Sequence, residues 1–165
     1  PACSGKVIKE KEGEVAYRCI NPSCPAQLER RLLHFASRKA MDIEGMGEAA
    51  VSQLVGLKLV KNFSDIYKLK EEDLSRLDLF KDKKVKNLLA AIRKSKGNPL
   101  SRLIYALGIR HIGEKAAFVL AKQFKTMGNL LTAKKEKLRN IYEVGPVIAE
   151  SIVDYFSQTT TKRCV

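Results

Sequence analysis

Three cysteines near the start of this 165-residue chain have a spacing that could hold a metal ion. Cys3 lies sixteen residues before Cys19, and Cys24 follows five residues later. Between Cys3 and Cys19, the segments KVIK and VAYR flank the turn-like EKEGE, which predicts a small β-hairpin. Thiolates at the two ends of such a ribbon can converge on a tetrahedral Zn²⁺. Zinc binding would then supply folding energy that so short a segment cannot obtain from a core.

A tetrahedral zinc site needs a fourth ligand. A cysteine immediately before Pro1 would complete a C-x-x-C pair with Cys3, and we expect such a cysteine to precede Pro1 in a longer chain. His34 is a candidate substitute, but its apolar neighbours fit a core or solvated histidine better. Cys164, in the C-terminal tail, is a weaker candidate. Free buried thiols are the alternative interpretation of the three cysteines.

Glycine-containing turns that precede helical segments form a second pattern. The clearest copy is IEGMGEAAV, which contains Gly45 and Gly47. The segments IRHIGEKAA and IYEVGPVIA keep the same apolar frame, with Gly113 and Gly145 at the second glycine position. A weaker copy, LDLFKDKKV, keeps the apolar positions but has neither glycine. These segments indicate an internal repeat of irregular spacing.

The repeated turns have the properties of phosphate-binding sites. Glycine allows a backbone turn with positive φ and leaves no side chain between main-chain N–H groups and a ligand. N–H groups that open a helix are unpaired, and the helix dipole favours an anion there. Arg110 and Lys115 would add charge without reading sequence, because phosphate contacts position a protein on DNA whereas base edges specify it. A tight turn without a ligand is the alternative, and we assign the glycine-free copy mainly to packing.

The overall charge agrees with an anionic partner. The chain has 31 Lys and Arg against 18 Asp and Glu, which gives a net charge of +13. Such an excess attracts polyanions, chiefly nucleic acid or an anionic membrane surface. No apolar run approaches the roughly 20 residues that span a bilayer, and the first residues lack a secretory signal. We therefore expect a cytoplasmic protein.

Apart from the ribbon, the expected elements are helices. Apolar spacing predicts a helix of about three turns from Pro25, and then helices over 49–57, 65–69, 83–95, 100–107, 114–124 and 146–156. Ser64 is the expected N-cap of the segment 65–69. Several aromatic residues fall at helix-face positions and are predicted to lie in the core: Phe63, Tyr67, Phe80, Phe118, Phe124, Tyr155 and Phe156.

These motifs together resemble the C-terminal half of the bacterial NAD⁺-dependent DNA ligase family. The resemblance covers about residues 1–156 and rests, in order, on CINPSCPAQ, LLHFASRKAMDIEGMGEAAVSQL, NPLSRLIYALGIRHIGEKAA and VGPVIAESIVDYF. It implies a mainly α fold with a four-cysteine zinc finger at 1–27, four tandem helix-hairpin-helix motifs at 28–157 and a disordered tail at 158–165. It also implies the zinc ligands Cys3, Cys19 and Cys24, and phosphate-facing turns centred on Gly45, Gly47, Gly113 and Gly145. With the charge of Arg110 and Lys115 added, these four glycines and two basic residues are the expected DNA-binding residues.

The resemblance further implies that DNA binding and catalysis belong to different parts of the parent protein. In this family a lysine in a K-x-D-G context takes AMP from NAD⁺, and no K-x-D-G occurs in these 165 residues. The chain is then expected to have no catalytic residues and to bind nicked duplex DNA in replication and repair. Catalytic domains of the same parent chain, which use NAD and magnesium, would perform the reaction. The implied location is the bacterial cytoplasm, associated with the nucleoid and not with a membrane.

Two other functions remain open at this stage. The chain could be a stand-alone helix-hairpin-helix module of a repair or branched-DNA-binding protein, although the zinc ribbon before the first turn favours a ligase. It could also be a protein-interaction adaptor whose basic faces are only solvated, in which case its DNA affinity would not depend on salt. A nuclease is not favoured, because Asp42 and Glu44 alternate in a turn and resemble a solvated pair.

Overall fold

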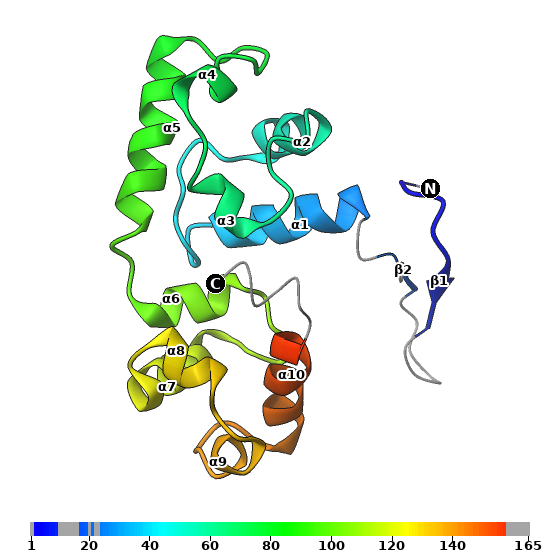
Figure 1. Ribbon diagram of the computed structural model, residues 1–165, viewed down its shortest axis with the longest axis vertical. Helices are drawn as coiled ribbons and strands as arrows, with labels where there is room; N and C mark the ends of the chain where they lie inside the picture. The colour runs from blue at the N-terminus through cyan, green and yellow to red at the C-terminus, as the bar shows by residue number, and fades with distance from the viewer. Residues whose placement is uncertain (1, 10–16, 20, 22–23, 158–165) are drawn as a thin grey trace.

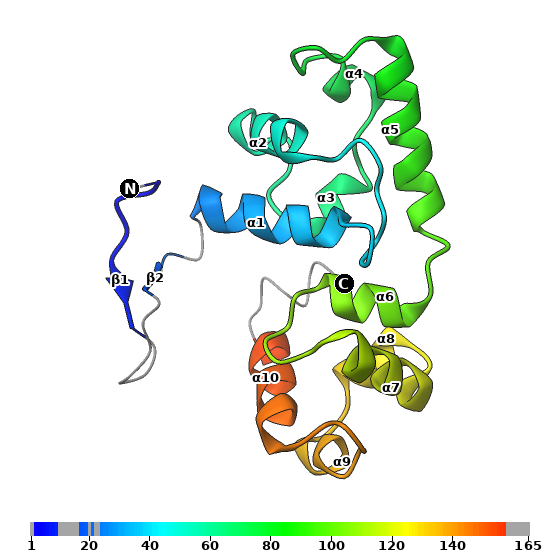
Figure 2. The same ribbon diagram turned by 180° about the vertical axis from the view of Figure 1, so that it is seen from behind.

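The computed structural model describes residues 2–9, 17–19, 21 and 24–157. These residues form a two-stranded ribbon and a helical body with two lobes, α1 to α5 and α6 to α10 (Figure 1). The ribbon lies apart from the body, beyond the first residue of α1, as the reverse view also shows (Figure 2). The elements are β1 (Val7–Ile8), β2 (Arg18–Cys19), α1 (Pro25–Ala36), α2 (Glu48–Gly56), α3 (Phe63–Ile66), α4 (Glu71–Leu74), α5 (Asp82–Ser95), α6 (Leu100–Ala106), α7 (Glu114–Phe124), α8 (Met127–Leu131), α9 (Lys135–Arg139) and α10 (Pro146–Ser157).

The ribbon is the predicted hairpin. β1 and β2 are antiparallel, with Val7 opposite Cys19 and Ile8 opposite Arg18. This register places Cys19 at the end of the ribbon that lies nearer to Cys3 along β1. The connecting segment 10–16 and the predicted tail 158–165 lie outside the described residues.

The six predicted helices after α1 are present, and three further short helices were not predicted. Helices α4, α8 and α9 have four or five residues each, too few for a 3.6-residue periodicity to be visible. The predicted N-cap of α3 is wrong. Asn62 caps this helix by accepting a hydrogen bond from the Asp65 amide at 3.1 Å, while the Ser64 hydroxyl donates to the Asn62 side chain at 2.7 Å.

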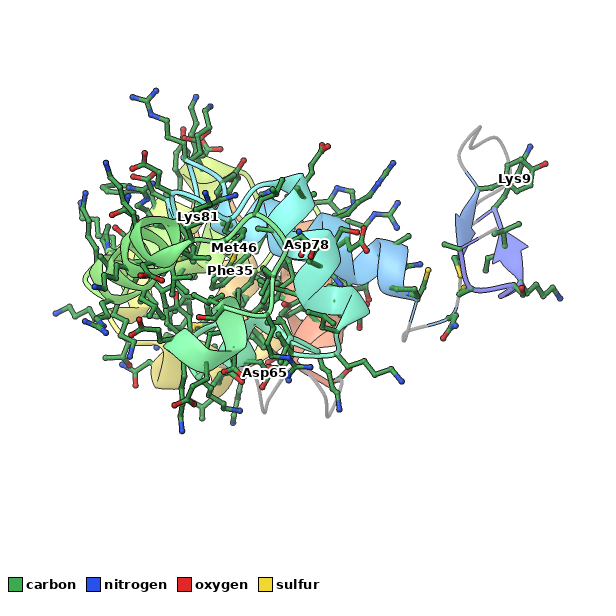
Figure 3. All side chains as sticks on the ribbon, turned by 90° about the horizontal axis from the view of Figure 1, so that it is seen from above. Lys9, Phe35, Met46, Asp65, Asp78 and Lys81 are labelled. Carbon is green, nitrogen blue, oxygen red and sulfur yellow. The ribbon has the colours of Figure 1, made fainter. Side chains whose placement is uncertain are left out.

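Buried apolar side chains from both lobes form the core. Phe35 lies in the middle of the body in Figure 3 and stacks on Phe63, with ring centroids 4.7 Å apart. The predicted core position of Phe118 is wrong, because its side chain is 63% exposed. Helix α7 buries its Ala117 and Leu120 face and turns Phe118 outward. The other predicted core aromatics are buried or half-buried, namely Phe63, Tyr67, Phe80, Phe124, Tyr155 and Phe156.

Polar contacts to main-chain carbonyls join the two lobes. The Asn98 side-chain amide donates to the Met41 carbonyl at 2.7 Å, and Arg102 Nε donates to the Ala40 carbonyl at 2.6 Å. An exposed ion pair of 2.8 Å connects Lys39 to Glu114. Because the segment after α1 is held in this way against α6 and α7, the turns that follow α1 and α6 belong to one connected surface.

Gly108 lies two residues after the end of α6, at the contact between the two lobes, and its backbone conformation favours glycine. Its φ is +65°, and a Cβ there would lie 3.4 Å from His34 Cδ2. Gly108→Ala is expected to lower the free energy of unfolding by about 1–2 kcal/mol, because a left-handed backbone is strained for alanine. Urea denaturation followed by circular dichroism would measure this. Gly128→Ala is the matched control, since its Cβ would meet open space within a helix; equal stability of the two variants would contradict the prediction.

Candidate nucleic-acid interface and cysteine cluster

Four turns of the same backbone geometry precede α2, α5, α7 and α10. We call residues 43–46, 77–80, 109–112 and 141–144 the first, second, third and fourth turns. In each, the last residue's amide donates to the first residue's carbonyl, at 3.2, 3.2, 3.1 and 2.9 Å respectively. The repeated frame predicted from the sequence is therefore a repeated structure, and it includes the copy without glycines.

The third residue of every turn has a left-handed backbone. At the first turn this residue is Gly45, with φ +89°, a conformation that glycine adopts without strain. The other three turns adopt φ values of +64° to +68° with larger side chains, namely Leu79, His111 and Glu143. Non-glycine residues rarely hold such φ values, so the surrounding structure must enforce them. Glycine at this position avoids backbone strain in the first turn, but the other three turns form without it.

The second glycine of the pattern is the N-cap of the following helix, and the fold does not require a glycine there. Gly47 and Gly113 have φ values of −85° and −90°, which any residue can adopt. A Cβ built on Gly47, Gly113 or Gly145 would have no described atom within 4 Å. These glycines therefore leave open space in front of the unpaired N–H groups at the start of α2, α7 and α10. In α10 the first helical donor is the N–H of Val147, because Pro146 has none. A phosphate oxygen could approach those N–H groups directly.

The second turn differs at this position. Lys81 occupies the N-cap with a φ of −84°, so its side chain stands where the other three turns are open. Lys83 and Lys84 are also exposed in the first turn of α5, and Lys84 Nζ lies 4.0 Å from the centroid of the Phe80 ring. The Gln53 side chain accepts a hydrogen bond from the Asp78 amide at 2.6 Å and ties this turn to α2. Figure 3 labels Lys81, Asp78 and Met46, which all belong to the lobe of α1 to α5.

The third turn brings the predicted basic residues together with an open N-cap. Arg110 and Lys115 are both exposed and lie on either side of Gly113. Glu114, the first residue of α7, is engaged by Lys39, and the hydrogen bond from Lys39 is the main reason why the pKa of this lysine is raised. The ion pair compensates the carboxylate that lies closest to this helix N-terminus. The third turn therefore combines an open N-cap with two exposed basic side chains.

The three predicted zinc ligands also lie together. The Sγ atoms of Cys3, Cys19 and Cys24 are all within 4.8 Å of one another, and those of Cys3 and Cys19 are 3.4 Å apart. Thiolates around a tetrahedral zinc ion, at Zn–S distances of about 2.3 Å, would be about 3.8 Å apart. Cys24 is buried and occupies the N-cap of α1, where its amide donates to the Asn21 carbonyl at 3.1 Å. The cluster fits three of the four ligands of a zinc site.

Local hydrogen bonds favour the thiolate form that zinc binds. The backbone N–H of Gly5 is the main reason why the pKa of Cys3 is lowered to about 7, with Cys19 and Asn21 contributing. The backbone N–H of Asn21 is the largest single influence on Cys19 and favours its thiolate, but the hydrogen bond and charge of Cys3, burial and the charge of Cys24 together raise the pKa of Cys19. A Cβ on Gly5 would lie 3.0 Å from Cys3 Sγ and 3.1 Å from Cys19 Sγ. Gly5 thus makes room for the sulfur atoms.

His34 does not belong to this cluster. It lies ten residues after Cys24 along α1, roughly 15 Å away at 1.5 Å per helical residue. Its Nε2 lies 2.9 Å from the Tyr105 carbonyl oxygen, and its ring packs against the edge of the Tyr105 ring. The interpretation of His34 as a packed histidine is confirmed. The other candidate for a fourth ligand, Cys164, lies outside the described residues.

Among the described residues, no helix is long and apolar enough to cross a bilayer.

Comparison with known proteins agrees with both features. The NAD-dependent DNA ligase C4 zinc finger domain matches residues 1–26, and a helix-hairpin-helix motif matches residues 102–165. The DNA ligase of Endomicrobium trichonymphae is 47% identical over 165 residues, all of this chain and 24% of that protein. The DNA ligase of Geotalea uraniireducens is 52% identical over 156 residues, 94% of this chain and 23% of that protein.

The helix-hairpin-helix match contains the third and fourth turns. For the first two turns, this motif stays a prediction that their common backbone geometry supports. The chain spans about a quarter of the length of the relatives that it matches. Because the ligase zinc finger, the following motif and whole-chain similarity occur together, the chain belongs to the NAD⁺-dependent DNA ligase family, as a segment that contains its C4 zinc finger and helix-hairpin-helix region.

Proposed function

We propose that this chain binds duplex DNA through the sugar-phosphate backbone and without sequence preference. The observation that carries this proposal is the open N-cap position of α2, α7 and α10, where neither the backbone nor the packing requires glycine. Backbone N–H groups at these positions bind phosphate oxygens. The proposed DNA-binding residues are Gly45, Gly47, Arg110, Gly113, Lys115 and Gly145.

Gly45 contributes differently from the other glycines in this set. Its left-handed φ shapes the first turn, whereas Gly47, Gly113 and Gly145 give a phosphate access to the amides. Arg110 and Lys115 add long-range attraction at the third turn, in a chain of net charge +13. Main-chain donors contact any phosphate equally, so the binding is insensitive to base sequence.

In the complete protein, the proposed role is to hold a nicked duplex for phosphodiester-bond formation by an NAD⁺-dependent DNA ligase in replication and repair. The relatives that this chain matches are DNA ligases. Binding on both sides of a break would keep the 3′-hydroxyl and 5′-phosphate aligned, which lowers the entropic part of the barrier. The reaction itself belongs to catalytic domains that use NAD and magnesium, since this sequence contains no K-x-D-G lysine.

Zinc has a structural role in this proposal. Bound to Cys3, Cys19 and Cys24 it would join the segment before β1 and the end of β2 to the N-cap of α1. We propose a zinc finger at 1–27 and a DNA-binding domain at 28–157. The proposed location is the bacterial cytoplasm, with the nucleoid.

Titration of a labelled nicked duplex at several salt concentrations tests the proposal. We expect the logarithm of the association constant to fall linearly with the logarithm of salt concentration, with a slope of about −0.9 for each phosphate that a lysine or arginine neutralises. A duplex of the same length and unrelated sequence is the control and should bind equally. Fluorescence anisotropy measures both. Affinity that does not change with salt would support an adaptor instead and would contradict the proposal.

A further inference from the structure

An apolar groove separates the third and fourth turns. It has a volume of about 390 Å³, and it lies between the first turns of α7 and the tip of the fourth turn. Phe118 and Val119 form one wall from α7, and Tyr142 forms the opposite wall. The charged side chains lie along its rim. Its lining residues are Glu114, Lys115, Phe118, Val119, Tyr142 and Glu143.

The aromatic side chains of this groove are unusually exposed. Tyr142 is 82% exposed and Phe118 is 63% exposed. A single exposed apolar side chain needs no explanation, but a gathering of them on a rigid frame indicates a contact surface. Nothing in the described part of the chain covers these aromatic rings. The groove is therefore available to a ligand.

The position of the groove identifies its occupant. One wall begins at the open N-cap Gly113, and the other is the turn that ends at the open N-cap Gly145. A DNA strand whose phosphates reach both N-caps must cross the space between them. Between its phosphates, such a strand presents deoxyribose rings and base edges, which are far less polar than the phosphates. The groove thus has an apolar lining where the strand is least charged.

We propose that this groove receives the deoxyribose rings and base edges of a DNA strand, with Tyr142 and Phe118 as the contacting side chains. The inference rests on the proposed DNA binding and adds a non-ionic contact to it. The carboxylate of Glu143 at the rim repels a phosphate, which favours sugar over phosphate beside Tyr142. The carboxylate of Glu114 is compensated by its ion pair with Lys39, at 2.8 Å. A protein segment is the competing occupant, and the experiment below separates the two.

A non-ionic contact has a measurable signature. Removal of an aromatic ring that becomes buried on binding weakens affinity by about tenfold, and such a contact releases no counterions. Tyr142→Ala and Phe118→Ala should each weaken binding to the labelled nicked duplex by about tenfold, while the salt slope stays unchanged. Tyr142→Phe should bind like the original chain, because the ring and not the hydroxyl makes the contact. Thermal unfolding would confirm that the variants fold.

Two matched variants complete the test. Val153→Ala removes an exposed apolar side chain of α10 that does not line the groove, and it should leave affinity unchanged. Lys115→Ala should reduce the magnitude of the salt slope by about 0.9, the effect of losing one phosphate contact. The chain contains no tryptophan, so Tyr142→Trp provides a single fluorescent probe. Its emission should be quenched when nicked duplex binds.

The outcomes are distinct. If the original chain binds DNA but Tyr142→Ala and Phe118→Ala bind equally well, the groove does not contact DNA and the inference is overturned. An altered salt slope in Tyr142→Ala would show an electrostatic effect and would also overturn the inference. If the original chain itself fails to bind, the proposed function fails and the inference fails with it.

Discussion

A chain in which Gly47, Gly113 and Gly145 are all replaced by valine is expected to bind nicked duplex DNA on the order of a thousandfold more weakly. Each valine would place methyl groups in the space in front of a helix N-terminus, where no described atom now lies within 4 Å of a built Cβ. A hydrogen bond to a charged group contributes about 1.5 kcal/mol, so three lost bonds amount to about 4.5 kcal/mol. Anisotropy titration at low salt measures the change.

The same variant should remain folded. Valine at an N-cap is less favourable than glycine by up to about 1 kcal/mol, but the extended φ at Gly47 and Gly113 is open to any residue. Gly56→Val is the control, because its Cβ at the other end of α2 also meets open space and no proposed phosphate site is near it. A folded triple variant with unchanged affinity would remove these N-caps from the interface.

Replacement of Cys24 by serine is expected to weaken zinc binding by at least about a hundredfold. Serine is neutral at pH 7 and replaces a thiolate, the ligand that structural zinc sites prefer. The helical content should change little, since the buried core of the described body contains no side chain of β1 or β2. Competition with a chromogenic chelator measures zinc affinity, and circular dichroism measures helix content.

Two other variants test the assignment of the ligands. His34→Ala should keep the zinc affinity of the original chain, because His34 contacts the Tyr105 carbonyl and not the cysteines. Gly5→Ala should weaken zinc binding although it removes no ligand, since its Cβ would lie 3.0 Å from Cys3 Sγ. Zinc affinity that is lost in His34→Ala and kept in Cys24→Ser would contradict the proposed site.

The four turns of the proposed DNA-binding surface could be predicted from sequence patterns, whereas the exposed groove could not. The repeated apolar frame and the glycines located all four turns, because these features are local and recur along the chain. The position of Phe118 could not be predicted correctly, because a helix has several faces and periodicity alone does not say which neighbour covers an aromatic ring. The apolar residues of α7 extend over more than one face of the helix, so the sequence was compatible with Phe118 facing either the core or the solvent.

The sequence by itself determined the features that depend on residue type and short spacing. It located the three cysteines, the ribbon between them, the longer helices and the open N-cap glycines. A left-handed φ at Gly45 was also predictable from its residue type, whereas the same conformation at Leu79 was not. At Leu79 the flanking apolar residues Leu77 and Phe80 are buried and hold the turn in place, so packing overrides the residue's own preference.

Only the tertiary structure decided how distant segments meet. It placed His34 against Tyr105, joined Lys39 to Glu114 and brought the third and fourth turns to the two sides of one groove. Such contacts depend on the angles at which helices pack and on the conformations of the connecting loops. No local pattern specifies these angles. Many pairs of apolar residues that are far apart in the sequence could pack equally well, and only the complete core determines which pairs are in contact.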